Sequence, residues 1–180
     1  VAHVYMEKFD SWDTDDMKSY IAEGRDDRIF AIAELLRRGI SSSEICKLTA
    51  INEYFIEMLE NIVDIENELR EHRNDVARLR NAKQCGFSDA EIARLWNMPE
   101  AQVWRLREAV ELFPTYDMID SCAASKDAYV PYFYSTFNDS GNTHIADSGR
   151  RKVVVLGSGP IRIGQGVEFD YSTVQAVKSL

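Results

Sequence analysis

The sequence predicts a mainly α-helical protein: a helical domain of two repeated three-helix units, followed by a strand, a glycine-rich loop and the start of a helix from an α/β domain. Apolar residues recur at helical spacing over 26–111, the pattern repeats after 47 residues, and an apolar run at 153–156 leads into four closely spaced glycines. These observations predict a lead-in over 1–25, a helical domain over 26–137, a linker over 138–152 and the first part of an α/β domain over 153–180.

Charge and composition narrow the classes of function. The 180 residues carry a net charge of −9. Residues 1–71 hold 17 acids and 8 bases, a net charge of −9, whereas residues 72–180 hold 13 of each. Such a chain repels nucleic-acid phosphates. No apolar stretch approaches the roughly 18 residues of a membrane span, and no signal peptide opens the sequence. We therefore expect a cytoplasmic protein without nucleic-acid or membrane partners.

The first helical unit is marked by capping residues. Residues 1–25 are acidic and show no clear periodicity, so we expect an extended or frayed lead-in there. An apolar stripe follows Asp26 and ends before Gly39, which is typical of a helix with a glycine after its last turn. Ser41 and Glu44 form a capping box that begins a short helix, and a longer amphipathic helix follows it.

The second unit repeats the first after 47 residues, which indicates an internal duplication. The two units are expected to bury their apolar faces against each other and so form an all-α body. Eight positions are identical between them: Gly39 and Gly86, Ser41 and Ser88, Glu44 and Glu91, Ile45 and Ile92, Leu48 and Leu95, Glu53 and Glu100, Leu59 and Leu106, Val63 and Val110.

The helical pattern ends at Phe113-Pro114. Aromatic residues are frequent over 113–137, among prolines and polar residues. They predict extended chain that is pinned to the helical body by aromatic anchors. Residues 138–150 are small and polar and indicate a linker.

The run from Val153 to Leu156 and the glycines after it predict the beginning of a βαβ unit. The loop is neither G-x-G-x-x-G nor a P-loop, so its spacing fits a ligand role and tight packing about equally. Leaving these four apolar side chains in water forgoes about 1.5–3 kcal/mol of burial free energy for each. We therefore expect the chain to be a piece of a longer protein.

Other candidate sites have competing interpretations. The repeated capped helix, turn and helix resembles a helix-turn-helix DNA reader, with Arg105 and Arg107 as exposed candidates, but neighbouring glutamates oppose them and favour a packing duplication. Trp96 and Trp104 fit either the core or an oligomer patch, and the core is favoured. The three histidines share no ligand spacing, and no catalytic or metal site is predicted. The cysteines, Cys46, Cys85 and Cys122, are expected as buried thiols.

Several segments together resemble one family. Gly159-Pro-Ile-Arg-Ile-Gly-Gln-Gly-Val-Glu-Phe-Asp-Tyr171 closely resembles the opening of the second synthetase half in the large subunit of carbamoyl phosphate synthetase. Asp120-Ser-Cys-Ala-Ala124 and Tyr132-Phe-Tyr-Ser-Thr-Phe137 are similar to the run that closes the helical oligomerization domain of that subunit, and residues 27–40 resemble its first helix.

The resemblance implies a parent ligase of arginine and pyrimidine biosynthesis. That enzyme makes carbamoyl phosphate from bicarbonate, two ATP and ammonia, which a glutaminase small subunit releases from glutamine; its two ATP-grasp halves use ATP and magnesium. This piece is then expected to join the halves, to contribute to a homo-oligomer, to hold no cofactor and to be inactive alone. By resemblance, Gly166 and Glu168 lie beside the carbamate tunnel, and the glycine-rich loop contains Gly157, Gly159, Arg162, Gly164 and Gln165. The alternative is a helix-turn-helix DNA-binding or protein-interaction module.

Overall fold

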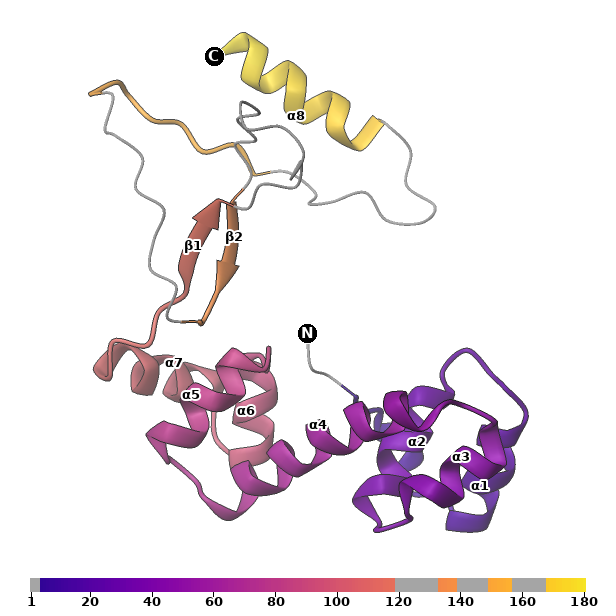
Figure 1. Ribbon diagram of the computed structural model, residues 1–180. Helices are drawn as coiled ribbons and strands as arrows, with labels where there is room; N and C mark the ends of the chain where they lie inside the picture. The colour runs from indigo at the N-terminus through magenta and orange to yellow at the C-terminus, as the bar shows by residue number, and fades with distance from the viewer. Residues whose placement is uncertain (1–3, 119–132, 139–148, 157–167) are drawn as a thin grey trace. The chain divides into compact units, whose positions relative to one another are not determined.

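The computed structural model describes residues 4–118, 133–138, 149–156 and 168–180. The chain divides into two compact parts, residues 1–143 and residues 144–180. The first part is mainly helical (Figure 1). Its described elements are η1 (Glu7–Phe9), α1 (Thr14–Ala22), α2 (Arg28–Arg37), α3 (Ser42–Thr49), α4 (Glu53–Glu71), α5 (Val76–Gln84), α6 (Asp89–Trp96), α7 (Glu100–Ala109), β1 (Thr115–Met118) and β2 (Phe133–Thr136).

The duplication is confirmed at the helix termini. Ser41 caps α3 by accepting a hydrogen bond from the Glu44 amide at 3.3 Å, and Ser88 caps α6 by accepting one from the Glu91 amide at 3.1 Å. Both capping-box serines therefore do in the structure what the sequence predicts.

The helices before these caps also end alike. The backbone φ is +82° at Gly39, after α2, and +89° at Gly86, after α5. In each turn an amide donates to the carbonyl five residues before it, from Ile40 to Leu35 and from Phe87 to Ala82. This is the Schellman ending, in which glycine adopts the left-handed conformation without a steric penalty.

The repeated unit contains one more helix than the sequence predicts. The expectation of an extended lead-in over 1–25 is wrong, because Asp13 caps α1 through the Asp15 amide and Met17 and Ile21 are fully buried. Helix α1 packs on α2 and α3, and α4 in turn packs on α5 and α6. We therefore define the first repeat as α1 to α3 with the N-terminal half of α4, and the second repeat as the C-terminal half of α4 with α5 to α7.

The two repeats do not bury their apolar faces against each other as the sequence predicts. Each has its own apolar core, and the two cores are separate. The long helix α4 runs from one repeat into the other (Figure 1) and supplies Ile56 and Val63 to the first core and Leu69 to the second. Each repeat completes its core with residues outside the three predicted helices, such as Phe9 in the first and Leu112 in the second.

A polar cluster joins the repeats between these cores. Glu66 of α4 is 1% exposed and accepts two hydrogen bonds from the Arg37 guanidinium, at 2.7 and 2.9 Å. Arg37 also donates to the Val4 carbonyl, and the ring of Tyr5 lies 4.0 Å from the guanidinium of Arg94 on α6. Burial lowers the pKa of Arg37, but its pairing with the carboxylates of Glu66 and Glu34 together outweighs burial and raises that pKa. The N-terminal segment therefore contacts both repeats.

The segment after α7 is a hairpin rather than simple extended chain. Strands β1 and β2 pair antiparallel, with Thr115 opposite Thr136 and Met118 opposite Phe133. Phe137 packs against the second core, which confirms one predicted aromatic anchor. The other predicted anchors within the described residues are exposed: Phe113, Tyr116, Phe133 and Tyr134. Tyr129 and Tyr132 lie outside the described residues.

In the part from 144 to 180, the predicted helix is confirmed and the predicted strand is not. Helix α8 spans Glu168–Ser179. Residues 151–156 have no regular secondary structure, and Val154 and Leu156 are 83% and 92% exposed. A strand is held by hydrogen bonds to a neighbouring strand. Among the described residues of this part there is no strand beside which the apolar run could pair.

Candidate functional site

The site residues that the sequence resemblance suggests cannot be placed. Gly157, Gly159, Arg162, Gly164, Gln165 and Gly166 lie outside the described residues. Glu168 is the first residue of α8, but its side chain is outside the described set as well. Their roles at the glycine-rich loop and the tunnel stay predictions. Within the ranges that are described, no group of three or more histidine, cysteine, aspartate or glutamate side chains could hold a metal ion.

The described residues instead contain an apolar groove on the first repeat, between the N-terminal ends of α2 and α4. We call it the first groove. It encloses about 320 Å³, and Arg28 is the one charged residue among those that line it. The apolar lining consists of Ile29, Ile32, Ile51, Phe55, Ile56, Met58 and Leu59.

Helical periodicity explains why this groove is open. Ile32 and Ile56 point into the first core and are 1% and 0% exposed. Their neighbours Ile29, Phe55 and Met58 extend the apolar stripe beyond the core and are 43%, 61% and 42% exposed. A stripe wider than the core needs is a common sign of a second packing surface. The groove is therefore a candidate interaction surface.

The second repeat carries a corresponding groove at the same place, and its chemistry differs. We call it the second groove. The 47-residue offset places Gln102 where the first groove has Phe55, and Arg105 where it has Met58. Met98 and Leu106 replace Ile51 and Leu59, so the floor stays apolar while the rim is polar. The duplication has preserved the hollow and changed what can bind in it.

The second repeat uses its charges internally instead. Asp89 at the start of α6 accepts hydrogen bonds from Lys83 at 2.8 Å and from Arg107 at 2.6 Å. Lys83 also donates to the Phe87 carbonyl and Arg107 to the Leu112 carbonyl. Burial raises the pKa of the Asp89 carboxyl, but the bonds from Arg107 and Lys83 outweigh burial and hold that pKa below its ordinary value.

This ion cluster holds the chain that leaves the helical body. The ring of Phe137, just after β2, lies 4.8 Å from the Lys83 ammonium and 5.5 Å from the Arg107 guanidinium. Cation–π contacts of this kind stabilise a desolvated ring beside a cation. The second repeat therefore anchors the hairpin.

The positions of several predicted side chains need correction. Arg107, an exposed phosphate-binding candidate in the helix-turn-helix interpretation, is instead 5% exposed and bonded to Asp89. The favoured core placement is wrong for Trp104, which is 48% exposed, and is confirmed for Trp96, which is buried and donates to the Leu69 carbonyl. Cys85 is exposed rather than buried, because it follows the last turn of α5 at the surface.

The predicted succession of helix, turn and helix is present in α6 and α7. Its second helix lacks one of its two candidate cations, since Arg107 is buried against Asp89. Arg105 is left on a helix that also carries Glu100 and Glu108. This arrangement disfavours a nucleic-acid interface.

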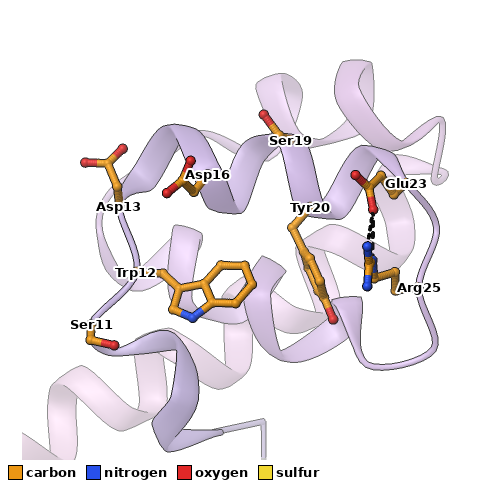
Figure 2. A pocket seen from close by; sticks show the side chains of 8 residues that line it. All are labelled: Ser11, Trp12, Asp13, Asp16, Ser19, Tyr20, Glu23 and Arg25. Carbon is orange, nitrogen blue, oxygen red and sulfur yellow. Dashed lines mark hydrogen bonds and ion pairs between the residues drawn. The ribbon is translucent and has the colours of Figure 1, made fainter.

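A wider hollow lies beside α1 (Figure 2). The rings of Trp12 and Tyr20 meet edge to face at 5.1 Å on its floor, and the carboxylates of Asp13 and Asp16 lie at its edge. Glu23 pairs with Arg25 at 2.7 Å across its other side. These charged side chains are all exposed to water, where charged pairs bind weakly. The hollow therefore has no buried polar group to select a ligand.

Sequence reasoning missed the first groove as a site, although the signal was present. Aligning the repeats sets Phe55 against Gln102 and Met58 against Arg105. Positions that pack in the core of each repeat stay apolar in both repeats, as Ile45 and Ile92 do. Positions that are apolar in one repeat and polar in the other therefore mark a surface with a separate role.

No helix among the described residues is long and apolar enough to cross a membrane.

Two family comparisons agree with this architecture. The family model for the carbamoyl-phosphate synthetase large chain, oligomerisation domain, matches residues 1–111, which include the first 25 residues and both repeats. The model for the carbamoyl phosphate synthase preATP-grasp domain matches residues 149–180. The first match covers more than half of the 180 residues. The chain therefore belongs to the carbamoyl-phosphate synthetase large-chain family and contains its oligomerisation domain.

Proposed function

We propose that this chain is the part of a carbamoyl phosphate synthetase large subunit that joins the two synthetase halves and contributes to self-association. The observation that carries the proposal is the order of the two family matches, an oligomerisation domain over 1–111 and a preATP-grasp domain over 149–180. A helical body that precedes the start of an ATP-grasp half fits a joint between two such halves.

In this proposal the chemistry belongs to other parts of the parent enzyme. The parent converts bicarbonate, ammonia and two ATP into carbamoyl phosphate, with magnesium bound at its ATP-grasp sites and ammonia supplied by a glutaminase small subunit. The described residues of this chain supply helical packing, an ion cluster and an apolar groove. We assign this piece no cofactor and no catalytic residue.

The carbamate tunnel extends the proposal to the glycine-rich loop. Gly166 and Glu168 are proposed to lie beside that tunnel, with the loop of Gly157, Gly159, Arg162, Gly164 and Gln165 leading to it. A Cβ at Gly166 would narrow a passage sized for a small anion. Replacing Gly166 by alanine in the whole large subunit should lower carbamoyl phosphate formation more than it lowers bicarbonate-dependent ATP hydrolysis in the first half.

The joint role is tested with the isolated chain and the whole subunit together. The chain alone should form no carbamoyl phosphate from ATP, magnesium, bicarbonate and ammonia. The whole subunit should form it, and replacing residues 4–112 by a flexible linker should uncouple the two ATP-consuming steps. Carbamoyl phosphate made by the chain alone would contradict the proposal. Salt-sensitive binding of duplex DNA would favour the helix-turn-helix alternative.

A further inference from the structure

We infer that the first groove is the surface through which a second copy of this chain binds, with Phe55 of each copy entering the groove of the other around a two-fold axis. The inference rests on the proposed self-association and names the surface that performs it. It is specific to the first repeat.

The surface is self-complementary in shape and chemistry. It holds a largely exposed apolar side chain, Phe55, at 61% exposed, in the wall of a hollow that Ile29, Ile51 and Leu59 also line. An exposed side chain and a hollow on the same patch satisfy each other when two copies meet across a two-fold axis. Contact between two copies would remove the apolar side chains of Phe55, Ile29 and Met58 from water. The burial of each side chain would stabilise the dimer.

Charge permits this contact despite the acidity of the chain. Residues 1–71 carry a net charge of −9, yet no carboxylate lines the first groove. On α4, residues Glu53, Glu57 and Glu60 are displaced by half a turn or nearly so from Phe55. Two copies can therefore join at the groove without placing their carboxylates against each other.

The lining and the asymmetry of the repeats limit the occupant. A small-molecule site holds several placed polar groups, whereas this groove of about 320 Å³ has one charged residue, Arg28, at its edge. The second groove carries Gln102 and Arg105 and lacks the largely exposed apolar side chain. One such surface per copy closes a dimer after a single contact, because an isologous interface leaves no second surface free.

The test is sedimentation velocity of the 180-residue chain from about 1 µM to about 1 mM, the range of weak to moderate association. The double variant Phe55→Gln/Met58→Arg gives the first groove the residues that the second repeat carries at the same positions. We expect a reversible dimer of the wild type and a dissociation constant about 100-fold higher for the variant. Both positions are exposed, so the variant should keep the helical circular dichroism of the wild type.

Leu48→Gln is the matched control. Leu48 is 37% exposed on α3 of the same repeat but does not line the groove, so this variant should dimerise as the wild type does. A wild-type dimer that the double variant leaves unchanged would overturn the inference and leave the proposed self-association intact. A wild type that stays monomeric would overturn both the second copy as occupant and the self-association of this chain. Groove-dependent binding of another part of the large subunit by such a monomer would identify that part as the occupant.

Discussion

The two repeats have the same helical frame and differ in where they place their polar and apolar side chains. The first repeat has an uncharged core and an apolar groove open to water, with Phe55 and Met58 at its rim. The second repeat closes a cluster of three charges beneath its surface and has Gln102 and Arg105 at the corresponding rim. The two repeats share one arrangement of helices but differ in role. The first repeat presents an apolar surface, and the second anchors the hairpin.

The largest expected effect breaks the ion cluster of the second repeat. Asp89→Ala leaves Lys83 and Arg107 buried without a counter-charge, which should cost roughly 3–5 kcal/mol of the free energy of unfolding. Ser42→Ala, at the corresponding position of the first repeat, should change it by no more than about 0.5 kcal/mol. Urea unfolding measures both variants. Equal losses would contradict the assignment of the cluster to the second repeat alone.

Acid should remove the same stabilisation gradually. The folded-state pKa of Asp89 lies below its ordinary value, so its contribution is present above the unfolded pKa, about 3.9, and is lost as pH falls through the folded pKa. The wild type should therefore have a higher free energy of unfolding than Asp89→Asn. This difference should be largest near neutral pH and should shrink below about pH 4. Other carboxyl groups titrate in both proteins and cancel. A difference independent of pH would contradict the role of the Asp89 charge.

The helix caps should respond equally in both repeats. Ser41→Ala and Ser88→Ala each remove one acceptor for an amide in the first turn of a helix, which should cost about 1 kcal/mol each. The two serines occupy the same place in separate repeats, so their effects should add in the double variant. Thermal and chemical unfolding measure these losses. A loss at one serine only would show that the duplicated caps are not energetically equivalent.

The smallest effect on stability should come from transferring the first groove to the second repeat. Gln102→Phe/Arg105→Met should leave the unfolding free energy within about 0.5 kcal/mol, because both positions are exposed. It should give each copy a second apolar surface, so that association proceeds beyond the dimer in light scattering. Ala101→Phe/Glu108→Met adds the same side chains to α7 outside the groove and should not do so. Association of both variants beyond the dimer would show that any added apolar surface on α7 causes it, and not the groove.

Most of the helical frame was predictable because local signals specify it. Ser41, Ser88, Gly39 and Gly86 each act within one turn of the chain, and their identity across the repeats made the duplication visible. Helix α1 escaped prediction because its packing face is short. Met17 and Ile21 are one turn apart among acidic residues, and their burial depends on contacts with α2 and α3 that are distant in sequence.

Burial of individual side chains was less predictable, for a tertiary reason. Arg107 and Arg105 look alike on α7, and only the position of Asp89, which is 18 residues away in sequence from Arg107, decides that Arg107 is enclosed. The separate cores likewise depend on the length of α4, which spaces the repeats apart. The alignment of the repeats indicates the positions that line the first groove. That the groove is open to water follows only from the three-dimensional packing of Ile32 and Ile56 beneath it.

Hydrogen–deuterium exchange of the wild-type chain, at concentrations well below and well above its dimer dissociation constant, tests the division between the repeats most directly. Amides over 28–32 and 53–59 should exchange more slowly in the concentrated sample, while those over 75–79 and 100–106 should exchange at the same rate in both. Protection that rises equally in both repeats, or only in the second, would contradict the claim that the first repeat alone carries the self-association surface.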